Sequence, residues 1–180
     1  MPTPATHSWP FDREKFRELI VLVADLCAEN TSFGDVYLNK VLFFSDAIAL
    51  QNWGTPITGA RYQKLPMGPA ARALLPVREE LATEGAVKVE MDGNRRVTHA
   101  LRKPHAVFSD QELELVEEIV QLFRGKWASH ISDISHAASP GWNLVDPKED
   151  IPLETQLIST RPVPAATVRR GKELAARFGW

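Results

Sequence analysis

Two histidines and an aspartate are the residues whose types best match a metal site. His130, Asp133 and His136 lie close together in the chain. Each residue of a helix advances about 100°, so Asp133 and His136 point about 300° and about 240° away from His130. Side chains spread so widely do not converge on one ion. The sequence therefore predicts helix caps and surface polar residues here, with no metal and no other cofactor.

The sequence also lacks the residues that nucleophilic catalysis and phosphate transfer need. Cys27, the one cysteine, lies on the inward stripe of a predicted helix, where a thiol is typically a small buried apolar group rather than a reactive thiolate. The segment GTPITG (54–59) has proline where a phosphate loop needs free amides, and no Lys-Ser or Lys-Thr follows it. We therefore expect a protein that is not an enzyme.

A basic stretch at 86–105 is the other chemically distinctive segment. Three predicted helices precede it and it is itself a predicted hairpin, which together form the outline of a winged helix. The helix that would read DNA, 76–85, carries three glutamates and one arginine, which would repel phosphate. We favour a solvated hairpin face, and a regulator that binds operator DNA is the alternative. In that alternative the phosphate contacts are Lys88, Arg95, Arg96, Arg102 and Lys103.

The composition fits one soluble domain. The chain has 180 residues, 44% of them hydrophobic, and a formal net charge of −2, so no overall field attracts nucleic acid or anionic lipid. A single cysteine excludes an internal disulfide. The first residues lack the layout of a signal peptide, and the most apolar stretch, 36–50, is too short and too polar to span a bilayer. We expect a cytoplasmic protein with no membrane partner.

The hydrophobic periodicity predicts helices that would position these residues. Residues 1–11 are a lead-in; one helix runs from the N-cap Asp12 to about Asn30, and a largely apolar, central one from the cap Asp35 to about Gln51. A loop with a short extended piece at 61–65 follows. Pro69 suits the first position of the next helix, which ends at Gly85. Pro76 either kinks this helix or marks its true start.

The second half of the chain adds one change of period. Residues 86–103 alternate in hydrophobicity around Asp92-Gly93-Asn94, which predicts a β-hairpin. Ser109 and Glu112 form a capping box that opens a helix to Phe123. Shorter helices are predicted at 128–136 and 166–177, with an irregular stretch between them. The expected fold is mainly α with minor β structure (α+β): a compact single helical domain with one β-hairpin and a winged-helix-like outline.

The segment LNKVLFFSDAIALQNWGTPITGARYQKLPMGP (38–69) carries an ordered set of motifs. It contains a Leu-x-Lys helix with a later Asp, then Gly-x-Pro-Ile-x-Gly, an aromatic and a Gly-Pro turn. It resembles the signature of the Panacea domain of SocA-like antitoxins, and the resemblance extends over about 12–158. The matching positions are Leu38, Lys40, Phe44, Asp46, Gly54, Pro56, Ile57, Gly59, Tyr62, Gly68, Pro69, His136, Pro140 and Trp142. The chain departs from the pattern at Met67, where the family has an aromatic, and at Ala70-Ala71.

The resemblance implies a bacterial or phage antitoxin that neutralises a cognate protein toxin by direct binding. One branch of the family also delivers its toxin to the ClpXP protease. For Lys40 and Asp46 we favour a structural role, because polar groups on a buried helix need partners and the adjacent loop offers backbone amides and carbonyls. Gly68 is predicted to take a conformation that a β-carbon would strain.

The basic C-terminal segment, 161–180, has no counterpart in the family pattern. Arginines and a lysine give it a local charge of +4, and a weak apolar stripe runs along it. Two interpretations remain open. The stripe packs on the domain, for example on the acidic face 110–118, or the segment orders on the toxin. In the second interpretation the anchors are Arg169, Arg170, Phe178 and Trp180.

Overall fold

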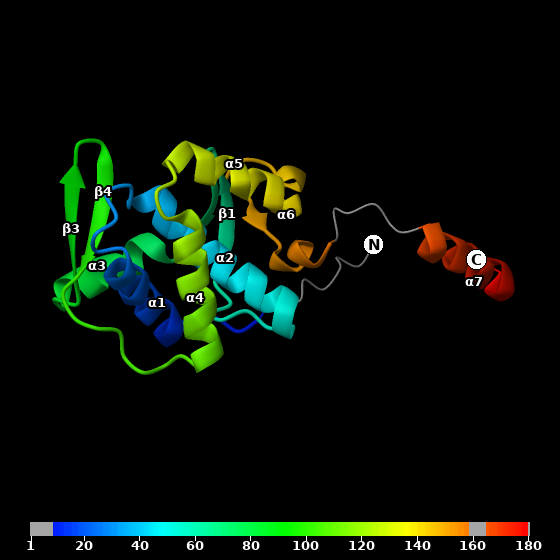
Figure 1. Ribbon diagram of the computed structural model, residues 1–180, viewed down its shortest axis with the longest axis horizontal. Helices are drawn as coiled ribbons and strands as arrows, with labels where there is room; N and C mark the ends of the chain where they lie inside the picture. The colour runs from blue at the N-terminus through cyan, green and yellow to red at the C-terminus, as the bar shows by residue number, and fades with distance from the viewer. Residues whose placement is uncertain (1–8, 159–164, 180) are drawn as a thin grey trace.

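Helix α2 (Asp35–Trp53) lies at the centre of the computed structural model, which describes residues 9–158 and 165–179 (Figure 1). Because apolar residues lie on most of its sides, α2 is buried around nearly its whole circumference. The elements packed on it include α1 (Arg13–Leu26), β2 (Gly68–Ala71), α4 (Asp110–Phe123), α5 (Ala128–Ala138) and the 3-10 helix η1 (Leu153–Leu157). The predicted central helix and the mainly α fold with minor β structure are confirmed.

Two of the predicted helix starts are confirmed at atomic detail. The Asp12 carboxylate accepts a hydrogen bond of 2.9 Å from the Lys15 amide at the start of α1, which ends at Leu26 rather than near Asn30. The capping box of Ser109 and Glu112 opens α4. The predicted cap Asp35 is wrong: Gly34 is the N-cap of α2, and the Asp35 carboxylate instead pairs with the buried Arg78 guanidinium, which needs an anion.

The prediction that Pro69 begins a helix is wrong. Pro69 lies in β2, which pairs antiparallel with β1 (Tyr62–Leu65) in a three-stranded sheet of order β2-β1-β5, where β5 is Asp150–Ile151. A proline is tolerated because β2 is an edge strand, whose outer side makes no ladder hydrogen bonds. Helix α3 (Leu74–Thr83) begins later, and Pro76 lies in its first turn. Of the two alternatives for Pro76, this agrees with the one in which it marks the true start of the helix. This sheet adds a second hairpin to the predicted one.

The predicted hairpin consists of β3 (Val87–Asp92) and β4 (Arg95–Ala100), joined at Gly93 and Asn94. It forms a separate two-stranded sheet beside α1 and α3. The stretch predicted to be irregular contains more order than expected. Helix α6 (Pro140–Leu144), capped by Ser139, and strand β5 both lie within it.

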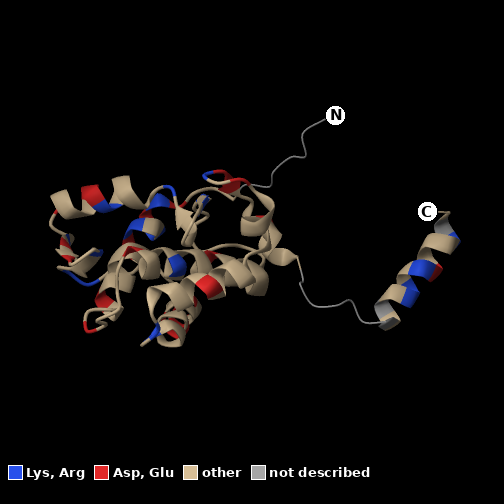
Figure 2. Ribbon diagram, turned by 90° about the horizontal axis from the view of Figure 1, so that it is seen from above, with Lys and Arg blue, Asp and Glu red and all other residues tan. Residues whose placement is uncertain are grey.

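Helix α7 (Ala165–Phe178) confirms the predicted C-terminal helix and lies apart from the other elements (Figures 1 and 2). Its lysines and arginines form a band along the helix in Figure 2. Most of the lead-in, residues 159–164 and Trp180 lie outside the described residues. In the ranges 9–158 and 165–179, no helix combines the length and apolarity needed to cross a membrane.

Candidate partner-binding site

Asp46 is the centre of a buried polar network on α2. Its side chain has no exposed surface, and its oxygens accept hydrogen bonds of 2.6 Å from both the amide and the hydroxyl of Thr58. The Ala60 amide at 3.4 Å and the Tyr62 hydroxyl at 2.8 Å also donate to it. Complete burial raises the pKa of Asp46 above its ordinary value, and these donors act in the opposite direction. The carboxylate therefore shapes the loop from α2 to β1.

Lys40 and Asn39 cover the outer edge of β2. The buried Lys40 ammonium donates to the Pro69 carbonyl at 3.0 Å, and the Asn39 side-chain oxygen accepts from the Ala71 amide at 2.9 Å. An uncovered strand edge would present these backbone groups to another chain. The two side chains of α2 therefore take the place of a further strand, and these contacts agree with the structural role expected for Lys40.

Burial lowers the pKa of Lys40 from 10.5 to about 7. Between these values the unfolded chain binds one proton more than the folded chain, so folding stability rises with pH from about 7 to about 10. Below this window both states are protonated and the slope disappears.

We expect Lys40→Met to reduce the rise of unfolding free energy with pH by up to about 1.4 kcal/mol per pH unit, the value for one proton. Urea unfolding at pH 7, 8 and 9 measures the slope. Lys172→Met, at an exposed position on α7, is the control and should retain the wild-type slope. Equal slopes in the wild type and Lys40→Met would contradict the prediction.

Helices α5 and α6 hold the β1–β2 turn from the other side. The Trp142 indole N–H donates to the Leu65 carbonyl at 3.1 Å, and the Ser132 hydroxyl donates to the Met67 carbonyl at 3.0 Å. His136 stacks on Trp142 with ring centroids 3.9 Å apart, and the Lys64 ammonium lies 4.4 Å from the Trp142 ring centre. Burial lowers the pKa of His136, and the charge of Lys40 acts in the same direction. Residues of the segment 38–69 and the motif residues of α5 and α6 therefore meet at the β1–β2 turn, which we call the supported turn.

The supported turn borders an open groove. A hollow of about 410 Å³ extends from Met67 and Leu75 to Asp35 and Val36 at the start of α2 and to Arg96 in β4. A second hollow, of about 520 Å³, shares these last three residues and continues to Met91 in the β3–β4 hairpin. We call the two together the α2 groove. It brings Met67 and Gly68 together with Arg95 and Arg96, which the sequence assigned to two different functions.

The α2 groove combines apolar walls with positive charge. Met67, Leu75 and Met91, which are 42%, 58% and 63% exposed, all border the α2 groove. Asp35 is already paired with Arg78, and Arg96 lies 3.8 Å from the same carboxylate. These three charged groups leave one positive charge in excess. The surface can therefore hold apolar side chains of a partner beside a carboxylate.

The five basic residues of the DNA alternative all have acidic neighbours. Arg102 binds the buried Glu18 through two hydrogen bonds of 2.8 and 2.7 Å, which fixes the segment after β4 to α1. Ion pairs of this kind reduce the positive charge available to a phosphate backbone. The pairs are Lys88–Glu90, Arg95–Asp92, Arg96–Asp35, Arg102–Glu18 and Lys103–Asp25.

The remaining candidate residues lie outside the α2 groove. Gly54 ends α2 in a left-handed conformation with φ of 76°, and Pro56 is buried in the loop that follows. Arg169 and Arg170 are exposed on α7, far from the β1–β2 turn in Figure 1. The side chain of Phe178 and all of Trp180 lie outside the described residues.

The described residues at this site include neither a cluster of metal ligands nor an exposed thiol. In the described part of the chain, no three His, Cys, Asp or Glu side chains come close enough to hold a metal ion. Cys27 is buried, and burial raises the pKa of its thiol to about 11.

Sequence reasoning missed several residues that support the turn. Asn39, Thr58, Ser132 and Ser135 all contribute polar contacts in or around the motif region. For Ser132 and Ser135 the available signal was a small polar residue at a helix position, because such a group must find a partner when it is buried inside the fold. Their partners could not be assigned, since Ser132 and Met67 are 65 positions apart in the chain.

Comparison with known proteins gives one match. The family model described as "Antitoxin SocA-like, Panacea domain" matches residues 38–143, more than half of the chain. The matched range begins at α2 and ends in α6, so it contains the supported turn and most of the α2 groove. No curated protein and no solved structure matches the chain.

Proposed function

The chain belongs to the SocA-like antitoxin family defined by the Panacea domain, and from this we propose that it neutralises a toxin encoded beside it by direct binding. The α2 groove is the proposed contact surface. Delivery of the toxin to a ClpXP-type protease stays a prediction from the resemblance, and binding of operator DNA stays the alternative predicted from the basic hairpin.

The observation that carries this proposal is the exposure of Met67, Leu75 and Met91 along the two adjoining hollows of the α2 groove. Large apolar side chains gathered around a hollow are typical of the core of a protein interface, and arginine is enriched at such sites. The turn that carries Met67 is held by the contacts of Lys40, Ser132 and Trp142. A surface that is already ordered loses little conformational freedom on binding, which favours affinity.

We expect Met67→Asp and Leu75→Asp each to weaken toxin binding at least about 30-fold, the loss typical of a residue that dominates an interface. Both side chains are exposed, so the melting temperature should change little. Titration of the purified toxin measures the affinity, and rescue of growth on co-expression with the neighbouring gene measures neutralisation.

Leu144→Asp is the matched control, because Leu144 is 73% exposed on α6 and does not line the α2 groove. It should bind and neutralise like the wild type. Wild-type binding by both groove variants would overturn the assignment of the surface. A neighbouring gene product that neither co-purifies with the chain nor is neutralised by it would overturn the proposed function.

A further inference from the structure

Strand β3 has an open edge. Just beyond its ladder with β4, the Leu101 amide donates to the Ala86 carbonyl directly opposite, at 2.9 Å. In an antiparallel pair, such hydrogen-bonded positions alternate with positions that make no ladder bonds. By this alternation, the N–H and C=O groups of Val87, Val89 and Met91 point away from β4. In the ranges 9–158 and 165–179, no hydrogen bond joins these groups to another residue, so they can pair with a further strand.

The surroundings of β3 leave this edge uncovered. β4 packs on α1 and α2, whereas the helix that packs on β3 is α3, which comes just before it in the chain. In Figure 1, β3 is the outermost strand, and β4 lies between it and α2. Proteins often block an open edge with a proline or a bulge. β3 contains no proline, and its pairing with β4 runs without a bulge, so neither block is present in it.

The charges on β3 are complementary to a second copy of the same strand. Lys88 and Glu90 have side chains 58% and 48% exposed and form an ion pair with each other. When two copies of β3 run antiparallel with Val89 opposite Val89 of the second copy, each Lys88 lies opposite Glu90 of the second copy. Each charge then has two neighbours of opposite sign. Charges that would repel most foreign strands therefore favour this one.

We propose that two copies of the chain pair through their β3 edges, about a two-fold axis at Val89, to form one four-stranded sheet. In this register, all the outward groups of Val87, Val89 and Met91 meet outward groups of the second copy. A slide by one residue sets them against groups that already bond to β4. A slide by two residues leaves one outward residue of each copy unmatched and sets Lys88 against Lys88, or Glu90 against Glu90. Hydrogen bonding and charge therefore select the same symmetric register.

The same register also covers apolar side chains on the other face of the sheet. Val89 meets Val89 of the second copy, and Met91 meets Val87 of the second copy. Met91 is 63% exposed in the single chain, so the pairing removes apolar surface from water. Met67 and Leu75 lie outside β3, so the dimer contact concerns only the hairpin end of the α2 groove.

Sedimentation equilibrium of the intact chain, without any toxin, tests the pairing. One strand pair is a small interface, so we expect a monomer–dimer equilibrium with a dissociation constant in the micromolar range. Val89→Pro removes an outward N–H that β4 does not use, and an edge strand tolerates proline at such a position. This variant should dimerise at least about 10-fold more weakly. Its circular dichroism spectrum should match that of the wild type, which shows that it is folded.

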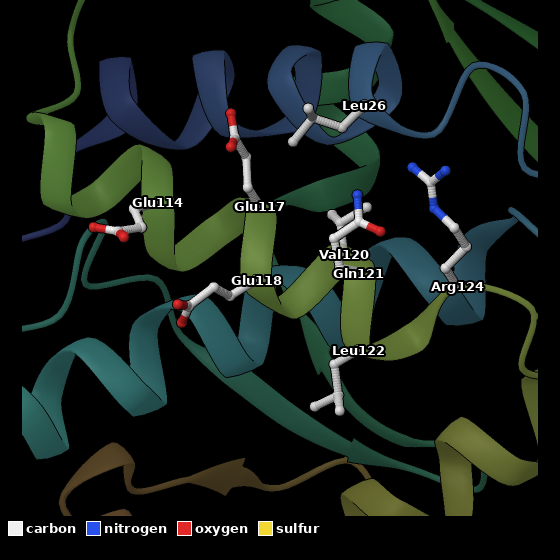
Figure 3. Close-up of a pocket in the computed structure, with 8 residues that line it drawn as sticks. All are labelled: Leu26, Glu114, Glu117, Glu118, Val120, Gln121, Leu122 and Arg124. Carbon is white, nitrogen blue, oxygen red and sulfur yellow. The ribbon is translucent and has the colours of Figure 1, made fainter.

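The charge variants test the register. Lys88→Glu and Glu90→Lys each set like charges against each other, so each alone should dimerise at least about 10-fold more weakly than the wild type. An equal mixture of the two should form heterodimers, because opposite charges then face each other across the axis. The control Glu114→Lys makes the same charge change at an exposed position that lines a hollow over α4 (Figure 3), and it should dimerise like the wild type.

Three results would overturn the proposal. The first is a wild-type chain that stays monomeric up to several hundred micromolar. The second is a dimer that Lys88→Glu and Glu90→Lys leave as strong as the wild type, since the contact would then lie elsewhere. The third is a mixture of these two variants that stays monomeric although the wild type dimerises. Toxin binding enters none of these measurements, so they are independent of the proposed function.

Discussion

Gly68→Ala is expected to lower the free energy of unfolding by about 3 kcal/mol. Gly68 has φ of 102°, a conformation that residues with a side chain rarely adopt. A β-carbon there would lie 2.4 Å from the Ser135 hydroxyl oxygen and 2.8 Å from Cε of Lys40. Both neighbours are buried and hydrogen-bonded, so neither can move without losing a contact. The free-energy costs of backbone strain and of overpacking therefore add to each other.

Gly85→Ala separates these two costs. Gly85 also has a positive φ, of 74°, but nothing lies within 4 Å of the position of its β-carbon. This control should lose about 1 kcal/mol, the cost of the left-handed conformation alone. Urea unfolding of both variants measures the difference. Equal losses would show that the close approach of Lys40 and Ser135 to Gly68 does not matter for stability.

Asp46→Ala is expected to lower the free energy of unfolding by about 3–5 kcal/mol. The substitution leaves the Thr58 amide and its neighbouring donors without their buried acceptor. Asp46→Asn keeps the shape and one acceptor oxygen, so we expect it to lose about half as much. Thermal or urea unfolding measures the series.

Tyr62→Phe is the control for this network, because it removes one donor and leaves the carboxylate with the others. Its expected loss is about 1 kcal/mol. If Asp46→Ala were no more damaging than Tyr62→Phe, the carboxylate would not be the centre of the network. In that case the loop from α2 to β1 would be held by its apolar contacts, such as the burial of Ile57.

The sequence by itself determined the features that depend on close neighbours in the chain. The capping box of Ser109 and Glu112 and the cap at Asp12 act within three residues, so their spacing can be read directly. The alternation around Asp92-Gly93-Asn94 likewise identified the β3–β4 hairpin. The apolar surface of α2 showed that this helix is central. The ordered motifs between Leu38 and Trp142 identified the family.

The tertiary structure alone decided which polar groups meet. Pro69 suited a helix start locally, yet it lies in a strand because β1 pairs with it and Lys40, 29 positions away, binds its carbonyl. Arg102 looked available for DNA, but Glu18, 84 positions away, is its partner. The α2 groove likewise depends on packing that brings the β1–β2 turn and the β3–β4 hairpin to the same end of α2. Such contacts arise from the burial of many side chains together, which no local pattern in the chain encodes.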